Sequence, residues 1–272
     1  MDLLGSLCHV LPLAEAVERL RAGTLPPRAA CITFDDGYAN NLELAGPILG
    51  ERGLPALVFV ATGFMAGGCM WNDIVIEAVR AATAPLDLRE WGLGMPPPGD
   101  AAARIRLLDQ LLPALKYLPP AERAAKALAL AEQAGAVLPA QPMMNAEQLR
   151  ALGRHGMAIG AHTVNHPILE AVDAREAERE IADSKAVLEA LSGQPVQFFA
   201  YPNGRPGSDY SRIHVDMVRR CGFTAAVSTA WGAAVAGSDL YQLPRMLPWD
   251  RSALRFGLRL MRSYRDRHSQ RI

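Results

Sequence analysis

The chain has 272 residues, half of them hydrophobic, and its 28 Lys and Arg residues balance its 28 Asp and Glu residues. This length fits one large domain or two small ones, with enough apolar residues for a sizeable core. Balanced charge gives no support for a nucleic-acid or membrane-surface partner. No C-x-x-C pair indicates a zinc ribbon, and no run approaches the ~20 apolar residues of a membrane helix.

The N-terminal stretch, residues 1–20, is apolar but lacks a basic region and soon becomes charged. This pattern does not fit a signal peptide. A cytoplasmic location is therefore the default expectation for the chain as given. A periplasmic or membrane-peripheral location is the alternative.

Apolar runs alternate with helical patterns in the first quarter of the chain. The predicted strands cover residues 8–13, 29–34 and 55–64. Between the first two, Leu13, Val17 and Leu20 follow helical spacing, and Gly23 ends the pattern. Residues 40–53 predict a second helix, interrupted by Pro47. The alternation implies an α/β fold with parallel strands and crossover helices.

The middle of the chain has a different character. Residues 72–156 contain several Ala- and Leu-rich helical patterns and no convincing strand. We interpret them as a helical insertion in a β/α scaffold. A separate helical domain is the weaker alternative, because the β/α alternation resumes immediately afterwards.

The last part of the chain returns to the first pattern. Predicted strands cover 157–163, 196–202, 223–229 and 241–247, and predicted helices cover 174–193 and 211–222. Six or seven β/α units would form a closed or nearly closed barrel. The tail is amphipathic and basic, and it predicts a packed helix over residues 250–268 with a membrane-surface helix as the alternative.

The predicted strand at 29–34 ends in two adjacent carboxylates, Asp35 and Asp36, within the stretch ITFDDGY. Like charges at the edge of a core repel each other and lose solvation. The stretch can be a plain Asp-Gly turn. Alternatively, one carboxylate binds a cation while the other transfers a proton.

A second polar cluster follows the predicted strand at 157–163. In GAHTVNHP, His162 and His166 are four residues apart, a spacing that lets two imidazoles share a cation. Parallel strands point their carboxyl ends to one face of a β/α barrel, so these histidines should meet Asp35 and Asp36. Two histidines and a carboxylate suit zinc or another first-row divalent ion. Structural histidines are the alternative.

A third strand end carries FAYPNGRPG, whose Pro and Gly residues predict a rigid turn beside the same face. Backbone N–H groups of such a turn can bind an oxyanion, although a plain turn fits equally well. Four aromatic residues are candidate sugar platforms, with packing as the alternative: Trp71, Tyr201, Trp231 and Trp249.

Together, TFDDG, HTVNH and FAYPNG resemble, in order, three motifs of the polysaccharide deacetylases with a nodulation-protein-B-type domain, carbohydrate esterase family 4. The resemblance covers roughly residues 8–245, and the helical insertion is its least typical part. TFDDGYANN and YQLPRML also resemble the branch that deacetylates poly-N-acetylglucosamine. The resemblance implies one domain over residues 1–272, folded as a distorted (β/α)7-type barrel. The implied activity is metal-dependent removal of N-acetyl groups from amino sugars of a polysaccharide or glycan precursor.

The resemblance also assigns roles to four residues of the first two motifs. Asp35 would be the general base. Asp36, His162 and His166 would bind a divalent metal, with zinc the first expectation and cobalt, nickel or manganese the alternatives.

Further roles follow from the second and third motifs. Thr163 would support the histidine loop through hydrogen bonds and contribute to substrate binding. Tyr201 and Pro202 would line the substrate site. The backbone N–H of Asn203 would stabilise the oxyanion.

Two features depart from the family pattern. The general acid usually comes from a late L-x-x-H motif, but only His214 and His268 follow Gly204, and neither stands at a predicted strand end. The poly-N-acetylglucosamine branch takes its acid from an earlier strand, for which this chain begins too close to TFDDG. His9 is the one early histidine, so a start truncated relative to that branch is one expectation.

The second departure is Ala200, where the third motif usually carries an arginine that orients the base. Arg245, in LPRM, could replace it from a neighbouring strand. Two alternatives to the deacetylase therefore remain: an impaired barrel that binds metal and glycan without turnover, and a hydrolase of small cyclic amides.

Overall fold

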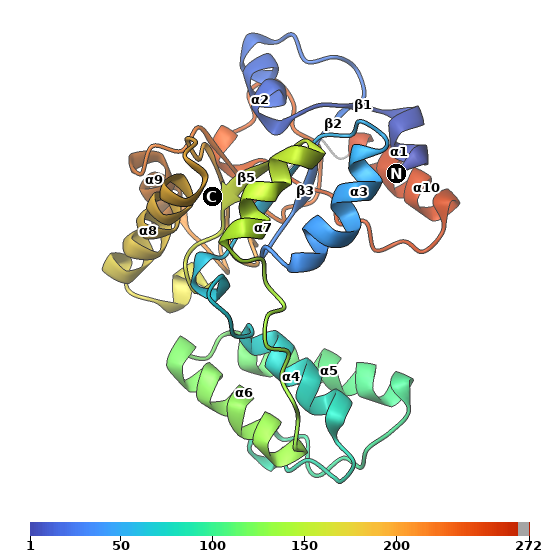
Figure 1. Cartoon of the computed structure of the whole chain (residues 1–272), viewed down its shortest axis with the longest axis vertical. Helices are drawn as coiled ribbons and strands as arrows, with labels where there is room; N and C mark the ends of the chain where they lie inside the picture. The colour runs from blue at the N-terminus through green and yellow to red at the C-terminus, as the bar shows by residue number, and fades with distance from the viewer. Residues whose placement is uncertain (266–271) are drawn as a thin grey trace. The chain divides into compact units, whose positions relative to one another are not determined.

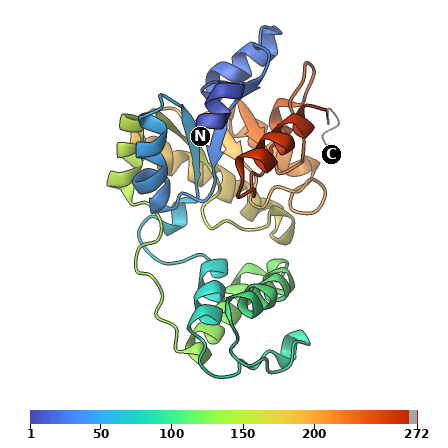
Figure 2. The same ribbon diagram turned by 90° about the vertical axis from the view of Figure 1, so that its right-hand side faces the viewer.

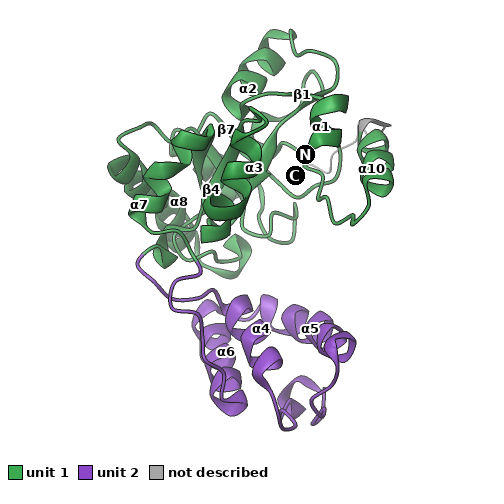
Figure 3. Cartoon of the chain, turned by 45° about the vertical axis from the view of Figure 1, so that its right-hand side comes forward, with its two compact units in different colours: residues 1–65, 143–272 green, residues 66–142 purple. Residues whose placement is uncertain are grey.

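The computed structural model describes residues 1–265 and 272. They form two compact units (Figure 3), the first comprising Met1–Met65 with Met143–Ile272 and the second Ala66–Pro142. Residues 143–156, assigned above to the helical insertion, belong to the first unit. The single domain spanning the whole chain stays a prediction.

The first unit is built around a parallel sheet of five strands in the order β3-β4-β5-β6-β7, curled like a half barrel (Figure 1). The strands are β3 (Ile32–Phe34), β4 (Ala56–Val60), β5 (Met157–Ala161), β6 (Phe198–Ala200) and β7 (Ala225–Val227). Each of these strands lies within an apolar run that the sequence predicts as a strand. The α/β class and the distorted barrel predicted from the sequence are confirmed.

The number of strands differs from the prediction. β1 (His9–Val10) pairs only with β2 (Ala29–Ala30), in a separate two-stranded sheet. The predicted strand at 241–247 is a 3-10 turn, Leu240–Gln242, followed by one bridge from Leu243 to Val227. Pro244 follows at once, and a proline has no N–H to continue a ladder.

Among its described residues, the first unit has seven α-helices. They are α1 (Asp2–Leu7), α2 (Leu13–Ala22), α3 (Gly46–Gly50), α7 (Ala146–Ala151), α8 (Ala174–Ser192), α9 (Arg212–Arg220) and α10 (Ala253–Arg265). Gly23 and Gly193 end α2 and α8 in the left-handed conformation, as helix-stop glycines do. The helix predicted at 40–53 instead divides into a π-helical turn, Asn41–Ala45, and α3, because Pro47 cannot donate a helical hydrogen bond.

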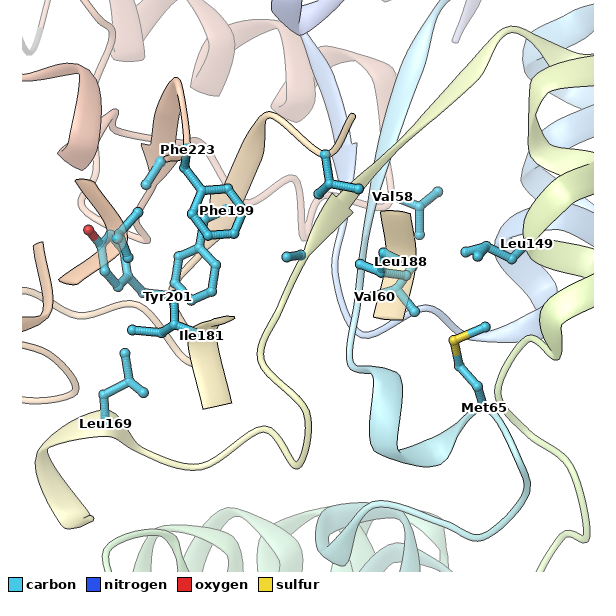
Figure 4. Close-up of a cluster of buried hydrophobic side chains, with 14 of the residues drawn as sticks. Val58, Val60, Met65, Leu149, Leu169, Ile181, Leu188, Phe199, Tyr201 and Phe223 are labelled. Carbon is cyan, nitrogen blue, oxygen red and sulfur yellow. The ribbon is translucent and has the colours of Figure 1, made fainter. Parts of the chain in front are cut away.

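Alternate residues of β4 enter two different hydrophobic clusters, as expected for a strand that is covered on both faces. Val58 and Val60 belong to a cluster that also includes buried residues of α3, α7, α8 and α9. Figure 4 shows part of this cluster, with Leu149 of α7 and Ile181 and Leu188 of α8. Leu57 and Phe59 pack with the buried residues of α2. All five residues of the strand are buried. The sheet is thus fixed firmly enough to hold polar residues at its carboxyl edge.

The second unit contains three helices with a hydrophobic cluster of their own. They are α4 (Trp71–Ala81), α5 (Ala101–Lys116) and α6 (Pro120–Ala134). Asp100 caps α5 by accepting a 2.8 Å hydrogen bond from the Ala103 N–H. Arg123 lies 4.9 Å from the centre of the Trp71 ring, so Trp71 takes part in packing within this unit. Among the described residues, no helix has both the length and the apolar character needed to cross a membrane.

Candidate active site

The predicted site residues gather at the carboxyl ends of adjacent strands. Asp35 and Asp36 directly follow β3, and His162 directly follows β5. β4 pairs in parallel with both strands. The doubled aspartate and the histidine motif are therefore brought to one edge of the sheet, as the strand-end argument predicts.

A sharp turn directs the two aspartates. Asp36 and Gly37 both have positive φ, 72° and 88°, and the Asp35 carbonyl accepts a 2.9 Å hydrogen bond from the Gly37 N–H. A Cβ at Gly37 would come within 2.9 Å of Val60 Cγ1 and 3.3 Å of its Cα. The last residue of the DDG motif is thus a glycine, because the turn passes so close to Val60 at the end of β4 that a Cβ would not fit.

The histidine loop is hydrogen-bonded to the segment that follows β4. Thr62 and Gly63 donate their backbone N–H groups to the carbonyls of Thr163 and Val164, at 3.2 and 2.8 Å. Within the loop, Thr163 Oγ1 accepts a 3.1 Å hydrogen bond from the His166 N–H. Thr163 and His166 have positive φ of 64° and 51°, a costly backbone that these contacts stabilise.

Glu180, which the sequence analysis missed, holds the same loop from the other side. One carboxylate oxygen accepts 2.8 Å hydrogen bonds from the Val164 and Asn165 N–H groups, and the other accepts a 2.7 Å bond from Asn165 Nδ2. Glu180 is 7% exposed. A signal was present: it falls on the apolar stripe of α8, beside Ile181, where a charged residue requires buried partners.

Three side chains converge with the geometry of a metal centre. Asp36 Oδ1 lies 3.5 Å from His162 Nε2 and 3.4 Å from His166 Nε2, and three donor atoms from these residues fit within 4.8 Å. Tetrahedral bonds of ~2.1 Å separate ligand atoms by about 3.4 Å, so the spacing fits a zinc-sized ion. His162 is 1% exposed, whereas the side chains of His166 and Asp36 are 13% and 26% exposed, which leaves an open side.

Hydrogen bonding favours the ligand form of His162. Its Nδ1 lies 2.7 Å from the Ala200 carbonyl, which can only accept, so Nδ1 carries the proton. In the neutral imidazole, Nε2 then presents a lone pair to the Asp36 carboxylate. Two acceptors 3.5 Å apart require a cation or a proton between them.

The charges of these groups shift their pKa values accordingly. Burial by itself would lower the pKa of His162, but the nearby Asp36 and Asp35 carboxylates outweigh it and raise that pKa. Burial by itself would raise the pKa of Asp36, but the two neighbouring histidines outweigh this effect and lower that pKa. In the absence of metal, His162 therefore binds a proton at the position of the cation, and it does so more readily than an isolated imidazole.

Asp35 stands beside this centre in a bidentate ion pair with Arg245. Both carboxylate oxygens lie 2.7 Å from the guanidinium nitrogens, and Arg245 Nε donates a 2.9 Å hydrogen bond to the Ser228 carbonyl. Burial would raise the pKa of Asp35, but Arg245 and then His162 bring it down to about 2. Arg245 thus occupies the orienting position proposed from the sequence, while its catalytic role stays a prediction.

We expect Arg245→Ala to move the acid limb of the pH–rate profile to higher pH. As the predicted general base, Asp35 would have to be ionised to accept a proton, so activity would be lost as pH falls through its pKa. Removing the guanidinium removes the largest influence that lowers the pKa of Asp35, so that pKa rises above about 2. The turnover number should fall roughly 10–100-fold, as for loss of an outer-shell partner. Arg220→Ala, which removes a surface pair with Glu178, is the control. An unshifted profile with full activity would refute the role of Arg245.

Glu180→Ala should weaken metal binding roughly 10–100-fold, because Glu180 holds the loop between the two histidines predicted to bind the metal. The variant leaves three donors of Val164 and Asn165 without their acceptor. Glu180→Gln keeps an acceptor for the backbone donors and should retain most of the affinity. Isothermal titration measures both, and Glu178→Ala on the same helix is the matched control. Equal metal affinity in all four proteins would rule out this positioning role.

The FAYPNG turn follows β6, the sheet neighbour of β5. Asn203 has a φ of 59°, and its carbonyl accepts a 2.7 Å hydrogen bond from Thr229 Oγ1. Tyr201 is fully buried, stacked 3.8 Å from the Tyr210 ring, and donates its hydroxyl to the Tyr241 carbonyl. The structure therefore does not support Tyr201 as a pocket-lining side chain.

The predicted roles of the other motif residues in this turn and in the histidine loop are not tested by this geometry. Substrate binding by Pro202 and Thr163 and oxyanion stabilisation by the Asn203 N–H stay predictions.

The early and late histidines lie elsewhere. His9 is paired in register with Ala29, six residues before Asp35, a separation of roughly 20 Å along the strand direction. His214 is buried in α9, where its Nδ1 accepts a hydrogen bond from the Ser211 N–H, and burial lowers its pKa. His268 lies outside the described residues. We therefore assign the acid to neither His9 nor His214.

Comparison with known proteins agrees with the motifs. The polysaccharide deacetylase family pattern matches residues 122–226, which include the second and third motifs. Over these residues the chain is similar to the polysaccharide deacetylase family. The Bacillus subtilis protein YxkH, which carries the name of a polysaccharide deacetylase, is 29% identical over 100 residues, or 37% of this chain and 34% of YxkH. The match thus spans about a third of that relative.

Two solved structures are similar to this chain in fold at low sequence identity. The deacetylase PplD of Streptococcus pyogenes, solved with acetate, is 21% identical and has a TM-score of 0.61, covering 95% of this chain and 82% of PplD. IcaB of Ammonifex degensii is 18% identical with a TM-score of 0.58, covering 96% of this chain and 84% of IcaB. At this identity, the comparison establishes a common fold.

Proposed function

We propose that this protein is a metal-dependent hydrolase that removes N-acetyl groups from amino sugars of a polysaccharide or glycan precursor. The observation that carries the proposal is the cluster of Asp36, His162 and His166, with Asp35 fixed beside it by Arg245. A divalent-metal site with an adjacent ionised carboxylate can activate water for the hydrolysis of an amide.

Asp36, His162 and His166 would hold the metal, with zinc the first candidate for this donor set and cobalt, nickel or manganese as alternatives. When bound, the cation would supply Lewis acidity to the acetamide carbonyl and to the attacking water. The Ala200 carbonyl keeps His162 in the tautomer that a metal needs.

Asp35 would accept the proton of the attacking water. Its pKa of about 2 keeps it ionised at neutral pH, and the two Arg245 hydrogen bonds fix the orientation of its carboxylate. The Asn203 N–H would stabilise the charge that develops on the former carbonyl oxygen. The products would be acetate and a free amino sugar.

The test is acetate release from N-acetylglucosamine oligomers. Protein loaded with one zinc ion per chain should release acetate, and chelator-treated protein should release none. Restoring the ion should restore the rate. Equal release by loaded and metal-free protein would refute metal dependence.

One observation favours a second candidate, a barrel that binds metal and glycan without turnover. Within the described part of the chain, His9 is paired on β1 with Ala29 and His214 is buried in α9 with its Nδ1 bonded to the Ser211 N–H, so we assign neither as the source of the proton that the leaving amine requires. In the acetate assay, a protein that holds one ion per chain, binds the oligomer and yet releases nothing would establish this candidate over the hydrolase.

A further inference from the structure

The end of β4 is bonded through its backbone to both halves of the candidate metal cluster. The Ala61 N–H donates a 3.1 Å hydrogen bond to the Asp36 carbonyl, and the Val60 carbonyl accepts a 3.1 Å hydrogen bond from the His162 N–H. The next two residues continue this pairing with the histidine loop. The segment 60–63 therefore joins the aspartate turn to the histidine loop.

Gly63, the last residue of this segment, has no room for a side chain. A Cβ at this position would lie 2.7 Å from Asn165 Oδ1 and 2.8 Å from the Val164 carbonyl oxygen. Atoms this close would overlap, so a side chain at residue 63 would force one side of the contact to move. The glycine thus allows the histidine loop to approach β4 closely.

Both neighbouring atoms are held in place. The Val164 carbonyl is part of the backbone and accepts a 2.8 Å hydrogen bond from the Gly63 N–H. The Asn165 side chain donates a 2.7 Å hydrogen bond from its Nδ2 to Glu180, which also accepts the Asn165 backbone N–H. A methyl group at residue 63 would therefore displace the loop itself and not a single mobile side chain.

A glycine at this point could instead serve as a flexible link. The chain leaves the first unit at Met65, two residues after Gly63, and continues into the second unit (Figure 2). Gly63, however, lies in the 3-10 turn Thr62–Phe64 and does not have a positive φ. Its backbone conformation is open to any residue, so the close approach of the histidine loop is the feature that requires a glycine.

The two histidines of the loop are held with different firmness. The side chain of His162 is 1% exposed, and its backbone N–H and its Nδ1 both contact carbonyl oxygens, at 3.1 and 2.7 Å. The side chain of His166 is 13% exposed, and this residue directly follows the two loop residues that lie against Gly63. A shift of those residues would therefore move His166 more than His162.

We propose that Gly63 is a positioning residue of the metal centre, because its missing side chain sets the place of His166. His166 Nε2 lies 3.4 Å from Asp36 Oδ1, the separation expected for two ligands of a zinc-sized ion. A larger residue at position 63 would move the imidazole out of this range. This inference rests on the proposed function, since it concerns the metal that the proposed hydrolysis requires.

The test is a double-mutant cycle of zinc affinity in the full chain, measured by isothermal titration. Gly63→Ala should weaken zinc binding roughly 10–100-fold, as for the loss of an outer-shell contact. His166→Ala should weaken it further, because a ligand is lost. In the double variant, Gly63→Ala should add nothing to the loss caused by His166→Ala, because it acts through that histidine.

The visible absorption of cobalt is a second measurement, and a general loss of stability would not change it. Cobalt is bound by the same kinds of ligand as zinc, and its absorption depends on the number and arrangement of those ligands. The spectrum of cobalt-loaded Gly63→Ala should differ from that of the unchanged protein. It should approach the spectrum of cobalt-loaded His166→Ala.

Gly153→Ala is the matched control. Gly153 lies in the 3-10 turn Leu152–His155 directly before β5 and does not have a positive φ. A Cβ there would meet no heavy atom from elsewhere in the fold within 4 Å. This variant should bind zinc like the unchanged protein. Thermal melting of the metal-free proteins should show that every variant remains folded.

Four outcomes would overturn the proposal. Unchanged zinc affinity in Gly63→Ala, with a clear loss in His166→Ala, would exclude Gly63 as a positioning residue while the metal site stands. Additive losses in the double variant would show that Gly63 does not act through His166. Loss of cooperative melting in metal-free Gly63→Ala would show that the glycine serves the fold. Absence of zinc binding by the unchanged protein would refute the proposed function itself, and this inference with it.

Discussion

Asp35→Asn should lower the turnover number of acetate release by on the order of 10²–10⁴-fold while leaving metal affinity near its original value. Asparagine has the shape of aspartate and can still accept a hydrogen bond, but it cannot take up a proton at neutral pH. Asp35 is not among the three residues that form the metal cluster, so the variant separates proton transfer from metal binding. The measurements are acetate release and zinc titration on the same preparation.

Asp87→Asn is the matched control for this variant. Asp87 also forms a two-oxygen pair with an arginine, Arg89, at 2.8 and 2.5 Å, but on the surface of the second unit. It should leave the turnover number unchanged. Undiminished acetate release by Asp35→Asn would exclude Asp35 as the base. A joint loss of activity and metal would instead make it a determinant of the metal site.

The candidate site could be located from the sequence, because the ends of strands can be recognised in a parallel fold. The two aspartates of TFDDG and the HTVNH motif each follow an apolar strand, and the carboxyl ends of parallel strands share one edge. The predicted meeting of Asp36, His162 and His166 therefore needed only the identity of the strands. The short distances between these side chains follow from the pairing of β4 with both β3 and β5.

The supports of the site were harder to predict because they depend on tertiary contacts. Glu180 reaches the histidine loop from a helix, and no local pattern states which backbone amides a buried carboxylate will meet. The limited extent of the last predicted strand has a different cause. There, Pro244 limits pairing after one bridge, although the residues around it have strand-like composition.

Arg245 lies between these two cases. The absence of arginine at Ala200 suggested a substitute, and YQLPRML offered one. The pairing itself depends on the path of the chain after β7, which brings the guanidinium to the Ser228 carbonyl and to both oxygens of Asp35. The sequence was enough to propose Arg245 as the partner of Asp35, but the bidentate geometry of the pair is seen only in the structure.

Asp36→Asn should abolish acetate release. It should also weaken metal binding by more than the roughly 10–100-fold expected for Glu180→Ala. The variant removes the one carboxylate of the cluster, and with it the negative charge that offsets a dication between two neutral imidazoles. Zinc titration and acetate release measure the two losses. Asp216→Asn, on the exposed side of α9, is the control and should lose neither.

The same carboxylate links metal affinity to pH, because proton and metal compete for one position. Asp36 helps to raise the pKa of His162, so the metal-free histidine holds its proton to higher pH than an isolated imidazole does. In the metal-free protein, this proton stabilises the fold fully below the unfolded pKa of about 6.5, and the contribution is lost as pH rises through the folded value. Zinc affinity should therefore rise with pH over this range, with protons released on binding. An affinity that is constant between about pH 5 and 8 would mean that His162 is not a ligand.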